Sequence, residues 1–354
     1  MNMPQSVLPS YGLNEDHMKV EAFGSGLINS TWKVSTANKD FILQRVNNTV
    51  FENPAHIAYN IRLIADYLKQ HHPEYSFVAP LTSSAGDEMV YLKDRGFFRL
   101  FPFVPGSHSK NVVSRPAEAF EAATQFARFT RLLNDFDVTQ LNITIPGFHD
   151  LSLRYQQFLS TLKNGNKKRI SESEKWISIL TVYSDIVKEY EHIKSSPEFK
   201  LRVTHHDTKI SNVLFNKEDQ GICVIDLDTV MPGYFISDVG DMMRTYLSPV
   251  SEEEKDFDKI EVREDFYKAI VKGYFNEMKE ELTEEEKKSF FYAGKFMIYM
   301  QALRFLTDHI NDDIYYGSKY EGHNLVRAGN QIALLQRLME KELILTKDQF
   351  KYTE

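Results

Sequence analysis

Apolar residues recur with two different spacings along the chain, one in its first hundred residues and another after residue 114. Short apolar runs bounded by turn residues predict three strands over 19–46 and two more over 77–104, around a turn at 83–87. Between these groups, Asn53 and Pro54 open a predicted helix that ends near residue 71, because its apolar residues recur every three or four positions. The first part of the chain is therefore expected to be rich in strands.

Helical spacing dominates from residue 114 onward. It predicts helices over 115–136, 173–195 and 325–345, with a basic polar loop at 164–169. Residues 296–306 are apolar on nearly every side, which is typical of a buried helix. A chain of 354 residues is too long for one small core, so we expect an α+β protein with two domains. The predicted domains are a small sheet domain over 1–103 and a larger, mainly helical domain over 104–354.

The composition is ordinary for a globular protein, with 42% apolar and 26% charged residues. A formal net charge of −8 disfavours non-specific binding to nucleic acid or to an anionic membrane surface. The chain has one cysteine, Cys223, so we expect no internal disulfide and a reducing compartment. Because no apolar run reaches about 18 residues and no basic and apolar leader begins the chain, the sequence predicts a cytoplasmic protein without a membrane span.

The densest group of chemically useful side chains lies just after residue 203. A polar loop carries Asp207 and Asn212, and Asp226 and Asp228 follow further on. The apolar runs between these pairs predict a hairpin with its turn at 216–221, which would bring its two ends together. Phosphoryl transfer needs one carboxylate to orient a hydroxyl, and an amide and a second carboxylate to hold magnesium. An Asx turn explains Asp207 alone, but it does not explain the whole set at these spacings.

The pattern His205-x-Asp207-x4-Asn212, followed by Asp226, resembles the catalytic and metal-binding segments of the aminoglycoside phosphotransferase and choline kinase superfamily. The spacing from Asp207 to Asn212 is also that of the protein-kinase catalytic loop. One branch, the N-acetylhexosamine 1-kinases, is similar to several strings of this sequence: HHDTKISNVLF, CVIDLDTVMPGYFISDVGDMMR, FGSGLINSTWKV, FILQRVN and LRFLTDHINDD. The resemblance implies a two-lobed, protein-kinase-like fold that uses ATP and Mg²⁺.

The resemblance implies a role for each residue of the central segment. Asp207 would be the catalytic residue that touches the acceptor hydroxyl and accepts its proton, while Asn212 and Asp226 would hold Mg²⁺. Asp228 would assist the metal or contact the sugar. Lys209 would neutralise the transferred phosphoryl group, and a surface lysine is the alternative interpretation.

The first domain is expected to bind the nucleotide. A glycine-rich turn lets backbone amides approach a phosphate, although a tight hairpin turn uses the same residues: Gly24, Ser25, Gly26 and Asn29. In the resembled fold a strand cation reaches the α- and β-phosphates, and Arg45 or Gln44 stands at that position. A helix glutamate often pairs with this cation, whereas residues 58–60 carry no acid. The hinge backbone would meet adenine at Phe101, Phe103 and Val104.

Arg304 stands inside the apolar segment 296–306 and needs a partner, because a buried arginine is rare unless it is paired. Asp308, four residues later, is one candidate partner, and the resemblance favours a substrate instead. The nearby aromatic and polar stretch with Tyr316 and His323 suits sugar hydroxyls and ring faces, and an ordinary loop fits it equally well. A separate group, Asp238, Asp241 and Arg244, is predicted to brace the catalytic loop.

Three functions stay open from the sequence. The resemblance implies transfer of the ATP γ-phosphoryl group to the anomeric hydroxyl of N-acetylglucosamine or N-acetylgalactosamine. Another small-alcohol kinase of the superfamily, acting on an aminoglycoside, choline or homoserine, is the nearest alternative. The missing helix glutamate favours a nucleotide-binding pseudoenzyme, which the intact catalytic and metal-binding residues oppose.

Overall fold

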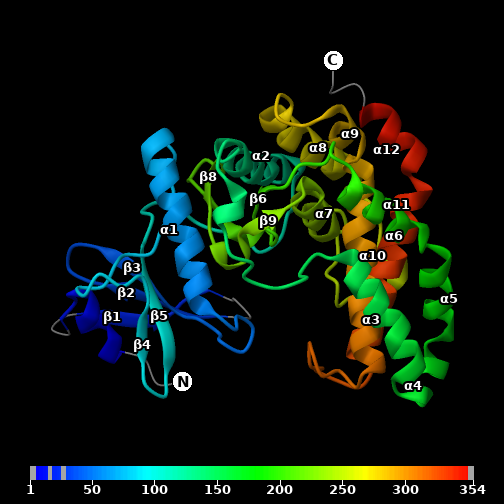
Figure 1. The fold of residues 1–354 in the computed structure, drawn as a ribbon, viewed down its shortest axis with the longest axis horizontal. Helices are drawn as coiled ribbons and strands as arrows, with labels where there is room; N and C mark the ends of the chain where they lie inside the picture. The colour runs from blue at the N-terminus through cyan, green and yellow to red at the C-terminus, as the bar shows by residue number, and fades with distance from the viewer. Residues whose placement is uncertain (1–4, 15–17, 25–28, 350–354) are drawn as a thin grey trace. The chain divides into compact units, whose positions relative to one another are not determined.

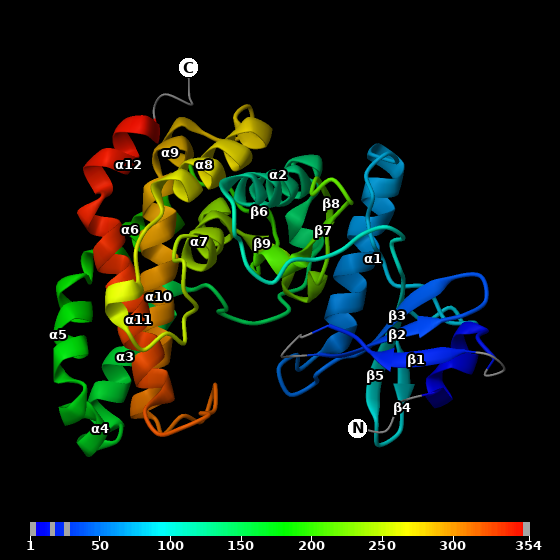
Figure 2. The same ribbon diagram turned by 180° about the vertical axis from the view of Figure 1, so that it is seen from behind.

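The computed structural model of the protein describes residues 5–14, 18–24 and 29–349. The chain divides into two compact units, each built from three stretches of sequence. Unit 1 comprises residues 1–108, 135–146 and 214–232, and unit 2 comprises residues 109–134, 147–213 and 233–354. Strands predominate in unit 1 and helices in unit 2 (Figures 1 and 2).

Unit 1 contains a five-stranded antiparallel sheet in the order β1-β2-β3-β5-β4, which confirms the small sheet and the three strands expected over 19–46. The strands are β1 (Lys19–Ala22), β2 (Ser30–Ser35), β3 (Asp40–Arg45), β4 (Val90–Leu92) and β5 (Gly96–Pro102). The short helix η1 (Gln5–Tyr11) adds two apolar residues to the core of this sheet, which consists of Val7, Leu8, Val20, Trp32, Val34, Leu43, Phe98 and Leu100. One face of the sheet is thereby removed from water.

The hairpin of β4 and β5 differs from the prediction, which placed its turn at 83–87. The turn lies at 93–95 instead. Asp94 in this turn and Gly96 directly after it adopt positive φ angles of 64° and 89°, which suit a tight turn. Residues 77–82 form no strand, and Leu81 makes a single bridge with Leu100. Pro80 lacks an amide hydrogen, so this segment cannot extend the ladder.

Two other predicted elements of unit 1 are confirmed. Helix α1 (Pro54–His71) begins and ends at the expected residues and buries the face with Ile57, Ile61, Ile64 and Leu68. Strands β7 (Val213–Phe215) and β8 (Gly221–Val224) pair as the predicted hairpin, and η2 (Val138–Gln140) and η4 (Leu227–Thr229) complete the described elements of the unit.

Unit 2 is built around α10 (Phe290–Ile310), the helix expected to be buried. It packs against α11 (His323–Glu340), α7 (Phe235–Tyr246) and α3 (Leu151–Asn164), as Figure 1 shows. A second packed pair is α2 (Pro116–Leu132) and α8 (Glu264–Met278). The other elements are α4 (Lys167–Glu172), α5 (Glu174–Val182), α6 (Asp185–Ser195), α9 (Glu284–Lys288), α12 (Glu342–Gln349), β6 (Arg202–Thr204), η3 (Ile210–Asn212) and η5 (Phe257–Lys259), with β9 (Met231–Gly233) at the unit boundary.

Two helix predictions in unit 2 need correction. The basic segment 167–169 is the start of α4 and not a loop, because the side chain of Asn166 accepts hydrogen bonds from the amides of Lys168 and Arg169 and caps the helix. The single helix expected over 173–195 is two helices, α5 and α6. Ser184 is the N-cap residue of α6 and Asp185 lies in its first turn, a pattern that favours a new helix start.

The start of α2 holds a buried acid. Glu118 accepts hydrogen bonds from the backbone amide and hydroxyl of Ser114 and from Arg115, and Lys110 lies 3.3 Å from it. Burial raises the pKa of Glu118, but these donors together outweigh burial and lower it to about 2. The carboxylate therefore contributes to stability at neutral pH.

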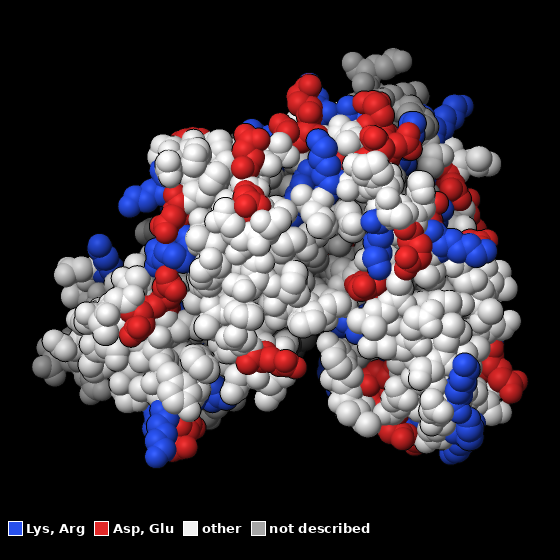
Figure 3. Space-filling model, in the orientation of Figure 1, with Lys and Arg blue, Asp and Glu red and all other residues white. Residues whose placement is uncertain are grey.

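The surface shown in Figure 3 carries acidic and basic side chains intermixed over the visible face. Among the helices of the described residues, none combines the length and the apolar character needed to cross a bilayer.

Candidate active site

The loop between β6 and η3 carries the predicted catalytic residue, and its shape depends on one unusual backbone position and on a close contact with a glycine of β9. His206 has a positive φ of 65°, and its ring nitrogen Nδ1 lies 3.1 Å from the carbonyl oxygen of Thr204. The ring packs against the backbone of Gly233, where an added Cβ would lie 2.5 Å from His206 Nε2. Glycine at 233 therefore leaves the space that the His206 ring needs immediately before Asp207.

Two carboxylates of α7 hold the backbone of this loop, as the sequence predicted. Asp238 accepts hydrogen bonds from the amides of His205 (3.0 Å) and His206 (2.8 Å), and Asp241 accepts one from the amide of Thr208 (2.9 Å). Burial raises the pKa of Asp238 to about 7, against the two amide hydrogen bonds that favour its ionised form. Because each carboxylate acts on backbone amides, both are positioning residues.

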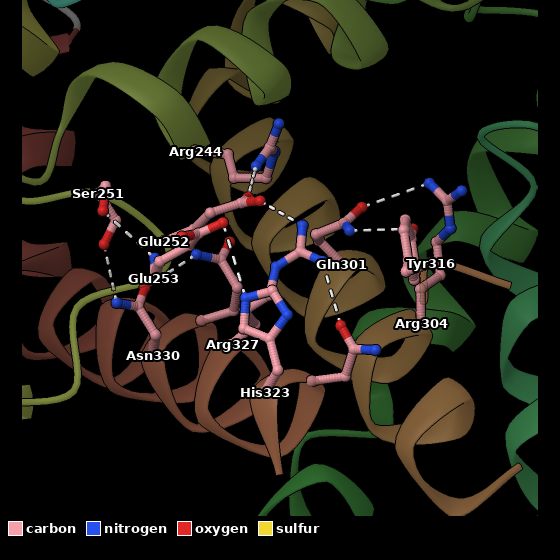
Figure 4. Close-up of polar contacts among 12 residues, drawn as sticks. Arg244, Ser251, Glu252, Glu253, Gln301, Arg304, Tyr316, His323, Arg327 and Asn330 are labelled. Atoms are coloured by element: carbon pink, nitrogen blue, oxygen red, sulfur yellow. Dashed lines mark hydrogen bonds and ion pairs between the residues drawn. The ribbon is translucent and has the colours of Figure 1, made fainter. Parts of the chain in front are cut away.

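Helix α7, which carries Asp238 and Asp241, is itself held in place by a close helix contact and an ion pair. Gly240 lies where α7 meets α10, and a Cβ there would lie 2.3 Å from the carbonyl oxygen of Ala293. Arg244 donates to Asp241 Oδ1 at 3.0 Å and pairs with Glu252 at 2.8 Å. Figure 4 shows this chain of charges continuing from Glu252 to Arg327 of α11.

Asp207 sits between a cation and an amide. Lys209 Nζ lies 3.0 Å from Asp207 Oδ1, and Asn212 Nδ2 donates to the Asp207 carbonyl oxygen (2.9 Å) and to Oδ2 (3.1 Å). Burial raises the pKa of Asp207, but the charges of Lys209, His205 and Arg244 outweigh burial and hold it below its ordinary value. The carboxylate is thus ionised at neutral pH, which is the state that can accept a proton from a hydroxyl.

The two predicted metal ligands offer oxygen atoms of the kind that Mg²⁺ prefers. The nitrogen of the Asn212 amide is used toward Asp207, so the carbonyl oxygen is the end that remains for a metal ion. Asp226 is exposed and has a left-handed backbone, with φ and ψ both 60°, a conformation that clusters at functional sites. Among the described residues, no group of three or more His, Cys, Asp or Glu side chains could hold a metal ion. Asp226 belongs to unit 1 and Asn212 to unit 2, so their convergence stays a prediction.

Unit 1 contains a buried cation that the sequence reading missed, Arg99 on β5. Its Nη1 lies 2.5 Å from Asp228 Oδ1, and its Nε and Nη2 donate to Gln44 Oε1 at 3.1 and 2.8 Å. Asn29, at the end of the glycine-rich turn, donates to Asp228 Oδ2 at 2.8 Å. Both carboxylate oxygens of Asp228 are therefore engaged inside unit 1, and its contact with a metal or a sugar stays a prediction.

The buried ion pair of unit 1 involves no residue of helix α1. Gln44 on β3 faces Arg99, whereas Arg45 is exposed, so the buried cation comes from β5 and its acid is Asp228. At the position expected to lack an acid, α1 carries the buried Asn60, whose Nδ2 donates to the carbonyl oxygens of Asn142 (2.8 Å) and Val230 (3.0 Å). The phosphate contact expected of Arg45 stays a prediction.

The structure places only part of the predicted nucleotide contacts. Ser25 and Gly26 lie outside the described residues, and Gly24 adopts a positive φ of 76°. At the predicted hinge, the guanidinium of Arg99 lies 5.0 Å from the ring of Phe101, and the ring of Phe103 lies 6.3 Å from that of Phe23. Val104 accepts a hydrogen bond from the hydroxyl of Ser107. The contact of Phe101, Phe103 and Val104 with adenine stays a prediction.

Asp308 is not the partner of Arg304. Its two oxygens accept hydrogen bonds from the backbone amides of Tyr315 (2.7 Å) and Tyr316 (2.9 Å). Arg304 donates weakly to Gln301 Oε1 (3.3 Å) and to the hydroxyl of Tyr315 (3.4 Å). Gln301 in turn donates to the Tyr316 hydroxyl at 3.0 Å, so these side chains form one group on the face of α10 shown in Figure 4.

His323 is the first residue of α11, and its side chain is buried. Its Nδ1 accepts a hydrogen bond from the amide of Lys319 at 3.3 Å, and its Nε2 lies 3.6 Å from Glu253. Burial lowers the pKa of His323, and the charge of Arg327 lowers it further. A contact of His323 or Tyr316 with a substrate stays a prediction.

Comparisons with known proteins agree with this fold. A family model described as the phosphotransferase enzyme family matches residues 19–280. A microcompartment-associated aminopropanol kinase has a similar structure at 15% identity, with a TM-score of 0.69 over 96% of this chain and 97% of that chain. An amicoumacin kinase in complex with AMP-PNP and Ca²⁺ matches at 13% identity, with a TM-score of 0.60 over 97% and 92%. A choline kinase from Cryptosporidium parvum matches at 14% identity, with a TM-score of 0.56 over 98% of each chain.

Identities this low establish a shared fold, here the kinase-like combination of a small antiparallel sheet and a mostly helical remainder. The family model spans most of the chain and includes both Asp207 and Asn212. The chain therefore belongs to the phosphotransferase enzyme family and is a small-molecule kinase that uses ATP and a divalent metal ion.

Proposed function

We propose that the protein transfers the γ-phosphoryl group of ATP to the anomeric hydroxyl of an N-acetylhexosamine and produces the sugar 1-phosphate. The observation that carries the chemistry is the ionised Asp207, held between Lys209 and Asn212 on a loop whose backbone α7 fixes. The choice of sugar rests on the strings HHDTKISNVLF and LRFLTDHINDD, which are similar to N-acetylhexosamine 1-kinases.

In this mechanism Asp207 accepts a hydrogen bond from the anomeric hydroxyl and orients its oxygen toward the γ-phosphorus. A bond forms between that oxygen and phosphorus as the bond from phosphorus to the β,γ-bridging oxygen breaks, and ADP leaves. The hydroxyl proton passes to Asp207. Lys209, 3.0 Å from Asp207, holds a positive charge beside the path of the phosphoryl group.

Mg²⁺, when it is bound, neutralises the charge that develops on the phosphate oxygens. Asn212 Oδ1 and the carboxylate of Asp226 would hold it. The oxygen chemistry of these groups and the exposed position of Asp226 support this assignment.

The environment of Arg304 supports a polar, uncharged acceptor. A guanidinium without an acid nearby can donate hydrogen bonds to hydroxyl or acyl oxygens. The rings of Tyr315 and Tyr316 lie 5.7 and 5.4 Å from this guanidinium and offer apolar faces for a sugar ring.

A kinase for an amino alcohol is the second candidate. It is favoured by the similarity of the fold to an aminopropanol kinase and a choline kinase over nearly the whole chain. An ammonium acceptor needs acidic or aromatic groups around it, whereas a hexosamine with an acyl group does not. The two candidates therefore predict opposite responses when the charge of the acceptor changes.

The test is an incubation of the protein with ATP and a panel of N-acetylhexosamines and amino alcohols, with phosphorus NMR to locate the new phosphate. The expected product is a hexosamine 1-phosphate, and absence of transfer to every hexosamine would refute the sugar assignment. Asp207→Asn should lower kcat by about 10²–10⁴-fold while ATP affinity changes little. Asp185→Asn, an exposed acid on α6, is the matched control and should keep full activity.

A further inference from the structure

Two arginines of unit 2, Arg154 and Arg304, have no carboxylate at ion-pairing distance among the described residues. Arg154 donates to the backbone carbonyl oxygens of Gly147 (2.8 Å) and Phe148 (3.4 Å) and to the side chain of Gln157 (3.1 Å). Arg304 donates only to neutral groups, as described above. Within the part of the chain that the structure describes, neither guanidinium has a carboxylate oxygen at ion-pairing distance. An arginine that is partly buried without an acid is unusual and calls for a ligand or a functional reason.

Carboxylates of the surrounding elements are engaged elsewhere. Asp308 binds the amides of the Tyr315 loop, and Asp313 pairs with Arg169 at 2.7 Å. Asp150 caps α3 by accepting a hydrogen bond from the amide of Leu153. Among the described residues, these carboxylates therefore make no ion pair with Arg154 or Arg304, and the charge of Asp150 acts on Arg154 only from a distance.

His149 connects this charge to the catalytic loop. Its ring stacks on Phe148 with centroids 4.4 Å apart and lies 5.2 Å from the ring of His206. The guanidinium of Arg304 lies 5.5 Å from the same Phe148 ring. Since His206 directly precedes Asp207, Phe148, His149 and Arg304 lie next to the loop that carries the proposed catalytic carboxylate.

The pKa values of His149 and Arg154 are both lowered by neighbouring cations. Burial lowers the pKa of His149 well below its ordinary value, and the charges of His206, Arg304, Arg244 and Arg154 lower it further. Burial also lowers the pKa of Arg154, and Arg304 adds to that effect. His149 is consequently neutral at pH 7, and its buried Nδ1 has no hydrogen-bond partner within the described residues.

We propose that Arg154 and Arg304 form a charge filter that makes the enzyme favour neutral or anionic acceptors over acceptors with an ammonium group. An ammonium bound beside Arg154 and Arg304 would meet two cations that form no ion pair among the described residues, in a partly buried setting where charge repulsion is poorly screened. A hydroxyl, acyl or carboxylate oxygen would instead accept hydrogen bonds from the guanidinium groups. This inference rests on the proposed function and adds which class of acceptor the site disfavours.

The test compares acceptors that differ in charge at one position. Glucose and glucosamine differ at carbon 2 by a hydroxyl against an ammonium, and N-acetylglucosamine adds the acyl group. We expect kcat/KM of the wild type for glucosamine to be lower than for glucose, and to rise as the pH passes the pKa of the ammonium. Arg304→Gln should narrow the ratio between the two sugars by about tenfold, the effect of one charge at close range near a protein surface.

Three control variants separate the effect of charge from that of structure. Arg304→Lys should keep the preference for the neutral sugar, because it keeps the charge, and Arg154→Lys should do the same. Arg337→Gln removes a charge in the last turn of α11, where Arg337 pairs with Glu340, and should leave the ratio unchanged. An unchanged ratio in Arg304→Gln would overturn the proposal.

The outcome can be told apart from failure of the proposed function. If no sugar is phosphorylated, the sugar assignment falls, and the filter is tested with 1,2-propanediol against 1-amino-2-propanol. Preference of the wild type for the diol supports the filter without the sugar assignment. Preference for the amino alcohol overturns the filter.

Discussion

Replacing Arg99 with methionine should destabilise unit 1 strongly, because it leaves the buried carboxylate of Asp228 without its counter-ion. The side chains of this pair are 1% and 3% exposed, and their charged atoms lie 2.5 Å apart. Removing one partner of a buried ion pair costs about 3–5 kcal/mol, because the remaining charge has lost both water and its counter-ion. The hydrogen bonds from Arg99 to Gln44 are lost as well.

The two tryptophans allow each unit to be followed separately. Trp32 lies on β2 in unit 1 and Trp176 on α5 in unit 2. In a Trp176→Phe background, Trp32 fluorescence during urea unfolding reports on unit 1. Arg99→Met should lower the free energy of unfolding of unit 1 by at least about 3 kcal/mol relative to that background.

A double-mutant cycle and a surface pair supply the controls. Arg99→Met combined with Asp228→Asn should be less destabilised than the sum of the two single changes by about 2–3 kcal/mol, since no uncompensated charge remains. Arg62 pairs with Glu88 in the same unit at 2.8 Å, but the side chains are 33% and 29% exposed, so Arg62→Met should cost less than about 1 kcal/mol. Additive single effects in the Arg99 cycle, or equal losses at Arg62 and Arg99, would refute the reasoning.

Three further predictions concern charge and space in unit 2. The pKa of Glu118 is lowered from 4.5 to about 2 in the folded state, which corresponds to about 3 kcal/mol of stabilisation at about 1.4 kcal/mol per pKa unit. This stabilisation is present above pH 4.5 and is lost as the pH falls toward 2. In Glu118→Gln, the urea midpoints of unfolding at pH 7 and pH 3 should therefore differ less than in the wild type. Lys209→Met should raise the pKa of Asp207 and move the acid limb of the kcat/KM profile to higher pH, and an unmoved limb would contradict the assigned charge contact. Gly233→Ala should cost about 1–3 kcal/mol and lower kcat because its Cβ would displace the His206 ring, whereas wild-type stability and kcat would show that the ring moves freely.

Much of the local structure could be read from the amino-acid pattern. The bounds of α1, the hairpin of β7 and β8, and the buried helix α10 follow from strong periodicity and turn residues. The bracing role of Asp238 and Asp241 was also predictable, because both acids lie on one turn of a helix that follows the polar loop.

Arg99 shows which contacts cannot be predicted from the sequence pattern. An arginine within the apolar strand of Gly96–Pro102 is the same signal that singled out Arg304 within α10, and it could have marked Arg99 as a paired residue. The partners could not be read, because Asp228 and Gln44 come from distant parts of the chain. In the same way, Asp308 accepts hydrogen bonds from the backbone amides of Tyr315 and Tyr316 and does not pair with Arg304. This contact depends on how the loop that contains the two tyrosines folds back.

The order of residues along the chain was enough to predict the kinase-like class and the helices and strands with strong periodicity, and it also marked Asp207 and Asn212 as candidates for one polar loop. Folding in three dimensions settled which charges are paired. Asp228 pairs with Arg99 and Glu252 with Arg244, whereas Arg154 and Arg304 have no carboxylate at ion-pairing distance among the described residues. The reason is physical. Periodicity and turn preference act between neighbours in sequence, whereas the fate of a buried charge depends on the desolvated partner that packing brings to it.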